Sequence, residues 1–228
     1  EASPPMTSLA RLHLVSPALE VGAFSYSEGL EVLIQNNTIC DETALLSWLE
    51  AELQQGVLRI DAAALRPLST LLSAWSATSD DAAQERLFEL DSWLQASREA
   101  AEVRAQQRQM GDSLIQLLAD LGHHLPDQLR LGWPSAWAWA CVALKIDDHA
   151  MVQGYLYGWV ANQLSAAVRL LPLGPSRAQL LQHKLGPLIL AQAAELQLAD
   201  PRELWSSGVG AGLAQLTHAE LYSRLFRS

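Results

Sequence analysis

The amino-acid sequence predicts an all-α fold, a single-domain bundle of about nine or ten helices over residues 1–228. Ala and Leu dominate the chain, and β-branched residues, which favour strands, are sparse. In residues 103–121 and 152–171 the apolar side chains recur every three, four or seven positions, which places them on one face of a helix. No segment shows a convincing period of two. A chain of 228 residues with 50% hydrophobic content is long enough to bury one sizeable core.

Capping residues and helix breakers predict where these helices begin and end. Helix starts are expected at Asp41, at Ser79–Asp81 and at Asp147–Asp148, because Ser and Asp side chains accept hydrogen bonds from the first free amides of a helix. Helix ends are expected at Gly122, Gly132–Pro134 and Pro172–Pro175. Loops are therefore predicted near residues 16–24, 122–134, 172–175 and 198–201.

Composition and charge exclude several classes of partner. The formal net charge is −10, from 15 basic and 25 acidic side chains, so a uniform phosphate-binding face is not expected and nucleic acid is a poor partner. Two distant cysteines, Cys40 and Cys141, form no disulfide framework and favour a reducing cytoplasm. Residues 1–8 lack the pattern of a signal peptide, and we expect residues 1–5 to be a cloning or processing remnant. The longest apolar stretch, Ala136–Leu144, is far below the ~20 residues that a bilayer requires.

The motifs of common active sites are missing from the sequence. No HExxH, GxSxG or GxxxxGK[ST] pattern occurs, and small-residue packing between helices explains the Gly208–Gly212 run better than a phosphate loop does. Six histidines are present, and the adjacent His123 and His124 would point about 100° apart on a helix. Scattered histidines are the favoured interpretation, and a metal site built from two His and two Cys stays as the alternative. An enzyme with its own active site is the weaker class.

Four segments carry more signal than helix packing needs. In Ser16–Glu31 two aromatic residues sit among small polar ones, which indicates either a binding loop or a loop that fills its own core. In Ser97–Leu118 three arginines, Arg98, Arg104 and Arg108, indicate either a binding face or a solvated one.

The other two segments lie in the second half of the chain. In Tyr155–Gly174 two amides interrupt an apolar helix, and Arg169 stands near its end, where it either meets a partner or complements the helix dipole. His218–Ser228 combines aromatic, Leu and Arg side chains, a composition typical of interface hot spots. The alternative for this tail is docking on its own domain.

The order of these segments resembles the UreF family of urease accessory proteins. The most specific pieces are AFSYSEGLE at residues 23–31, NQLSAAVRLLPLG at 162–174 and YSRLFRS at 222–228. The resemblance runs from residue 16 to the final Ser228. The chain departs from the usual family residues at Glu20, Pro175 and Ala219, where the family has Pro, Gln and Glu.

The resemblance implies a non-catalytic, all-α and usually dimeric protein. Such proteins join UreD, also called UreH, and the GTPase UreG on apo-urease, and the complex helps to deliver nickel to the carbamylated-lysine site of urease. It therefore implies a cytoplasmic adaptor or chaperone with no stably bound cofactor, because nickel is handled by the assembled complex. No catalytic or metal-binding residue is predicted.

The same resemblance, together with the segments above, assigns a set of partner-binding residues. The loop and tail would meet the UreD-type protein, and the helix that carries Arg169 would meet the GTPase. The predicted residues are Gly22, Phe24, Ser25, Tyr26, Glu31, Asn162, Arg169, His218, Tyr222, Arg224, Leu225, Phe226 and Arg227. Two other functions stay open: a GTPase-regulating protein that inserts Arg169 or a tail Arg into the nucleotide site, and an independent nickel-binding enzyme or carrier, which the scarcity of metal ligands disfavours.

Overall fold

The computed structural model describes residues 29–98, 100–127 and 129–205, and these residues form helices without strands. The all-α prediction is therefore confirmed. The described part holds eight α-helices and one short 3-10 helix, slightly fewer than the nine or ten predicted for the whole chain. They are α2 (Leu30–Gln35), α3 (Glu42–Gln55), α4 (Leu58–Thr78), α5 (Asp81–Ala96), α6 (Ala101–Asp120), α7 (Trp133–Ala143), α8 (Asp148–Leu170), α9 (Pro175–Leu196) and η2 (Pro201–Glu203).

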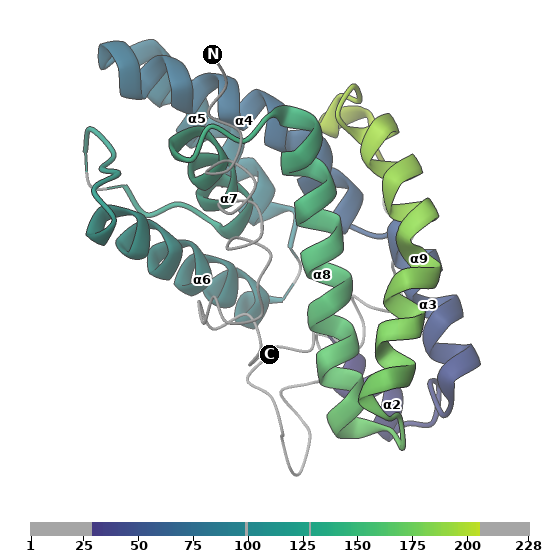
Figure 1. The fold of residues 1–228 in the computed structure, drawn as a ribbon. Coiled ribbons are helices and arrows are strands. Elements are labelled where there is room, and N and C mark those ends of the chain that lie inside the picture. Colours follow the sequence, from purple (N-terminus) through teal and green to yellow (C-terminus); the bar gives the residue numbers. More distant parts are fainter. Residues whose placement is uncertain (1–28, 99, 128, 206–228) are drawn as a thin grey trace.

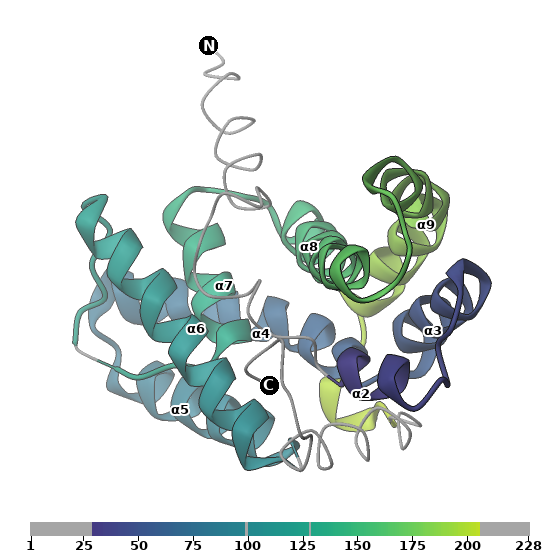
Figure 2. The ribbon, with the colours of Figure 1, turned by 90° about the horizontal axis from the view of Figure 1, so that it is seen from below.

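Helix α4 lies at the centre of the arrangement and packs against α5, α7 and α8 (Figure 1). Seen from below, α5, α6 and α7 lie on one side of it, and α3, α8 and α9 lie on the other (Figure 2). Helices α8 and α9 form an antiparallel pair, and α9 also contacts α3. The guanidinium of Arg177 on α9 donates two hydrogen bonds, of 2.9 and 2.6 Å, to the carboxylate of Glu42 on α3. This bidentate pair fixes how α9 lies along α3.

The predicted helix starts are confirmed at three aspartates. Asp41 accepts a hydrogen bond of 2.8 Å from the amide of Ala44, and Asp147 accepts one of 2.9 Å from the amide of Ala150. Asp80 caps α5 in the same way. Such caps are each worth about 1 kcal/mol, since they satisfy amides that have no partner within the helix.

One predicted boundary is wrong. Gly132–Pro134 does not end a helix but begins α7, with Gly132 as the capping residue. Proline is tolerated in the first turn because the amide it lacks would have no partner there, so the same residues can mark a start or a stop. Pro175 likewise stands in the first turn of α9. The predicted stop at Gly122 is confirmed, and its φ of 89° suits glycine.

The predicted apolar faces of α6 and α8 form part of the core. Their buried members are Val103, Met110, Leu114, Val152, Leu156, Val160 and Leu164. The α6 pattern fails at Leu121, whose side chain is 53% exposed because the helix ends at Asp120.

A buried carboxylate on α5 organises the start of α7. Asp91 Oδ1 accepts hydrogen bonds from the amide of Gly132, at 2.9 Å, and from the hydroxyl of Ser135, at 2.5 Å. Burial raises the pKa of Asp91, and the hydrogen bonds from Ser135 and Gly132 oppose that rise. Asp91 therefore acts as a long-range cap that joins α5 to α7.

The segment that leads into α7 passes so close to α6 that only glycine fits on α6 at that point. A methyl carbon built on Gly111 would lie 2.1 Å from the carbonyl oxygen of Leu131. Because backbone atoms cannot move aside cheaply, Gly111 is a packing requirement of the fold.

Candidate partner-binding surface

Helix α8 carries the predicted residues Asn162 and Arg169 and is the best described part of the candidate surface. Seven residues separate them, which is about two turns, so they lie on one strip of the helix. Asn162 is half-buried and Arg169 is exposed in the last turn of α8. Positive charge in this place also complements the helix dipole. The structure thus places both residues on one continuous helix, and their contact with a partner stays a prediction.

Gly158 lies one turn before Asn162 and belongs to the same strip. A methyl carbon added there would meet no atom within 4 Å. Glycine inside a helix costs about 1 kcal/mol relative to alanine. Among the described residues no neighbour requires this glycine, and the surface over its Cα is open to that extent. We call Gly158, Asn162 and Arg169 the α8 strip.

Near its start, α8 is fixed to the core by a buried ion pair. Asp61 Oδ2 on α4 accepts hydrogen bonds from the guanidinium of Arg98 and from the hydroxyl of Tyr155 on α8, the latter at 3.0 Å. The side chains of Asp61 and Arg98 are 2% and 8% exposed. Burial raises the pKa of Asp61, and the charge of Arg98 and the hydroxyl of Tyr155 oppose this rise. One carboxylate therefore joins α4, α8 and the connection between α5 and α6.

The sequence left open whether the three arginines of Ser97–Leu118 form a solvated face. The structure divides them. Arg108 is exposed, Arg104 is half-buried and donates a 2.6 Å hydrogen bond to the carbonyl oxygen of Arg98, and Arg98 itself is buried. A solvated face is thus the wrong interpretation for Arg98, because its charge is needed beside Asp61.

Among the predicted binding residues of the segment Ser16–Glu31, Glu31 is the one that the structure describes. It lies in α2, is buried and accepts a 3.3 Å hydrogen bond from the amide group of Gln35. Helix α2 packs against α8, so Glu31 belongs to the same half of the molecule as the α8 strip. A direct contact between Glu31 and a partner stays a prediction.

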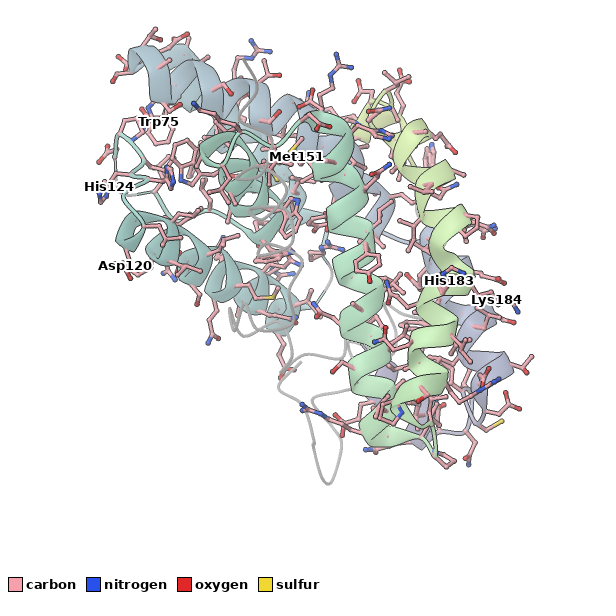
Figure 3. The ribbon with its side chains drawn as sticks, in the orientation of Figure 1. Trp75, Asp120, His124, Met151, His183 and Lys184 are labelled. Atoms are coloured by element: carbon pink, nitrogen blue, oxygen red, sulfur yellow. The ribbon has the colours of Figure 1, made fainter. Side chains whose placement is uncertain are left out.

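A second surface lies on α9, next to α8. Leu180 and Leu190 are 56% and 54% exposed, and Tyr157 on the adjoining side of α8 is 40% exposed. Gln182 donates a 3.3 Å hydrogen bond to the carbonyl oxygen of Tyr157, which ties α9 to this side of α8. Lys184 extends from α9 into solvent (Figure 3). This apolar surface, which we call the α9 face, is separate from the α8 strip.

The described residues include no group of three His, Cys, Asp or Glu side chains that could hold a metal ion. Among the same residues, no helix is both long and apolar enough to cross a bilayer.

Comparison with known proteins identifies the family. The UreF family model matches residues 39–186. A urease accessory protein UreF of Prochlorococcus marinus strain MIT 9215 is 35% identical over 96% of this chain and 98% of its own length. The UreF of Nostoc sp. strain PCC 7120 is 40% identical over 95% of this chain and 94% of its own, and that of Microcystis aeruginosa is 38% identical over 96% and 97%.

The chain belongs to the UreF family.

The other predicted binding residues of this UreF-family chain lie outside the described residues. They belong to the N-terminal loop and the C-terminal tail. These are Gly22, Phe24, Ser25, Tyr26, His218, Tyr222, Arg224, Leu225, Phe226 and Arg227.

Sequence reasoning missed the inner anchors of the UreF-family fold. Asp61 and Arg98 are 37 positions apart, and no spacing rule joins them. Trp48 on α3 and Trp159 on α8 pack with their ring centroids 5.8 Å apart, a contact that only the folded structure reveals. An Asp followed by a run of small apolar residues at 61–64 was the available signal, since a charge inside an apolar helix face needs a buried partner.

Proposed function

We propose that this chain is a non-catalytic adaptor of urease maturation in the cytoplasm. It would join a UreD/UreH-type protein and a UreG-type GTPase on apo-urease, and the assembled complex would handle nickel as cargo. The relatives named above are urease accessory proteins, and this chain matches them over nearly their whole length, which supports a role in urease maturation. The observation that carries the adaptor role is the α8 strip, which ends in the exposed Arg169 on a helix whose start is anchored in the core by Tyr155.

The α8 strip is proposed to meet the GTPase. Arg169 is exposed, and a guanidinium can bind a carboxylate through two parallel hydrogen bonds, whereas Lys supplies only a point charge. The matching surface of the GTPase would therefore carry acidic side chains.

The tail and the N-terminal loop are proposed to meet the UreD/UreH-type protein. Two aromatic and two Arg side chains in residues 220–228 have the composition of a hot spot, and Tyr26 would add an aromatic contact. A chain that ends after Ala219 should keep its helical circular dichroism and lose this partner. If the shortened chain unfolds, residues 220–228 belong to the core and this assignment fails.

The α9 face is proposed to hold a second copy of the chain. Leu180, Pro187 and Leu190 are exposed and lie seven and three positions apart, so they line one side of α9. Two such helices packed antiparallel around Pro187 would place Leu180 of one copy opposite Ala194 of the other, large against small. Leu190→Glu should convert a dimer into a monomer in size-exclusion chromatography with light scattering. An unchanged mass would remove the α9 face from the dimer.

A GTPase-regulating protein is the second candidate, because Arg169 is exposed at the end of a rigid helix. The test is GTP turnover by the UreG-type protein with and without this chain. An inserted arginine should raise turnover by about 10³- to 10⁵-fold, and Arg169→Ala should abolish the increase. An adaptor should leave turnover little changed or slower.

A further inference from the structure

We infer that the outer face of α5 binds a basic protein surface with an apolar centre. This α5 face consists of Phe88 surrounded by Asp81, Glu85, Glu89 and Ser92, all exposed. The inference rests on the proposed adaptor function, since it adds a further surface for one of the assembled proteins.

Phe88 is not part of the core. Its side chain is 55% exposed, whereas the buried side of α5 is made by Ala83, Leu87, Leu90 and Leu94. Single exposed apolar residues are common, so exposure alone would say little. Phe88 is however one of three phenylalanines in the chain, and the other two, Phe24 and Phe226, stand in predicted binding segments.

The charges around Phe88 are only partly balanced within their own helix, since Arg86 lies three positions from Glu89 but not three or four from Asp81 or Glu85. Asp81, Glu85 and Glu89 follow one another at intervals of four, so like charges face each other along the helix, which costs a few tenths of a kcal/mol per pair. The helix dipole favours Asp81 in the first turn but not the two glutamates further along. Arg86 is the one basic residue within α5. A partner with positive charges would relieve this repulsion.

The chemistry of the α5 face selects the partner. Three carboxylates repel phosphate groups, so nucleic acids and acidic membranes do not fit. Arg or Lys side chains around an apolar depression would pair with the carboxylates while Phe88 fills the depression, which is the anatomy of a protein interface.

The position of α5 leaves this surface accessible in the assembled adaptor. Helix α4 packs against both α5 and α8, and α5 lies with α6 and α7 at the left, apart from α8 and α9 at the right (Figure 2). A partner on α5 would therefore compete with neither the GTPase nor a second copy.

The test titrates the full-length chain with three purified proteins in turn: the UreD/UreH-type protein, the UreG-type GTPase and apo-urease. The variants are Phe88→Ala and the double charge reversal Glu85→Lys with Glu89→Lys. Matched controls are Leu121→Ala, which removes a side chain of similar exposure, and Asp120→Lys, which reverses an exposed charge at the end of α6 (Figure 3).

We expect both α5 variants to weaken binding to the same protein by about tenfold or more, while the controls bind like the wild type. Wild-type affinity for that protein should fall as salt is raised, and the charge-reversed chain should lose this dependence. Glu85→Gln with Glu89→Gln, which keeps side-chain size, should give an intermediate loss, and circular dichroism should be unchanged in all variants.

Two results would overturn the inference, and they differ in what else they remove. If the wild type binds its partners and the α5 variants bind equally well, the α5 face is not an interface and the adaptor function stands. If the wild type binds none of the three proteins, the adaptor function fails and the inference fails with it.

Discussion

Two parts of α8 differ in burial, although helical spacing puts them along one edge of the helix. Near the start of α8, the hydroxyl of the buried Tyr155 donates to Asp61, which also holds the buried Arg98. Fourteen positions later Arg169 is exposed, and among the described residues nothing lies over the Cα of Gly158. The buried part is determined by the fold, whereas the α8 strip reaches the surface. Changes at the buried part should therefore affect folding, and changes at the α8 strip should affect binding.

The largest effect is expected from Arg98→Ala, which leaves the carboxylate of Asp61 buried without its cation. Removing one partner of a buried ion pair costs about 3–5 kcal/mol in the free energy of unfolding. Chemical denaturation would measure it.

A second variant sharpens this test. Replacing the pair by apolar residues, Asp61→Leu with Arg98→Met, should recover most of the loss, because no buried charge then remains. A loss below about 1 kcal/mol for Arg98→Ala would show that α8 is not held at Tyr155 by this pair.

Asp91 provides the second largest effect and a contrast with Asp61, because Gly132 and Ser135 offer it neutral hydrogen-bond donors. Asp91→Ala leaves the amide of Gly132 and the hydroxyl of Ser135 without an acceptor, which should cost about 2–3 kcal/mol. Asp91→Asn keeps an acceptor oxygen and should cost much less. Equal losses for both variants would mean that the carboxylate charge, not hydrogen bonding, holds α7 in place.

The pH dependence of this site has a defined sign. The pKa of Asp91 is raised by burial, so the folded state binds its proton more tightly than the unfolded state. The wild type should lose stability relative to Asp91→Asn as pH rises above the unfolded value, near 3.9, and the difference should level off above the folded pKa. Parallel pH profiles of the two proteins would contradict the raised pKa.

Tyr155→Phe should have a smaller effect, because Arg98 still neutralises Asp61. Losing one hydrogen bond to a charged acceptor costs about 1.5 kcal/mol. Partner affinity should stay at the wild-type value, since Tyr155 is buried and is not part of the α8 strip. A loss of GTPase binding larger than the loss of stability would show that Tyr155 and the α8 strip are not independent.

The smallest effect on stability is expected at the α8 strip. Arg169→Ala and Asn162→Ala should change the free energy of unfolding by less than about 0.5 kcal/mol. Both should weaken recruitment of the GTPase, and Arg169→Lys should restore it only in part. Pull-down of the GTPase and the yield of urease activation are the measurements. Wild-type behaviour of all three variants would remove the α8 strip from the functional surface.

The sequence predicted those features whose physics is local. Asp41, Asp80 and Asp147 were recognisable as helix caps because their hydrogen bonds reach only two or three residues ahead. The shared strip of Asn162 and Arg169 follows from helical spacing alone. Gly132–Pro134 was misread because the same residues suit a helix start and a helix end.

Features that depend on distant partners could not be predicted. Arg98 appeared solvated because its acceptor, Asp61, belongs to another helix. Phe88 directly follows the core residue Leu87, and only the observed orientation of α5 shows that its ring faces outward.

The adaptor account is tested most directly by simultaneous binding. The full-length chain would be mixed with the purified UreD/UreH-type protein and the UreG-type GTPase, and the mixture analysed by size-exclusion chromatography with light scattering. We predict one species that contains all three proteins, and that Arg169→Ala removes only the GTPase from it. Two separate binary complexes, with each partner displacing the other, would contradict the account.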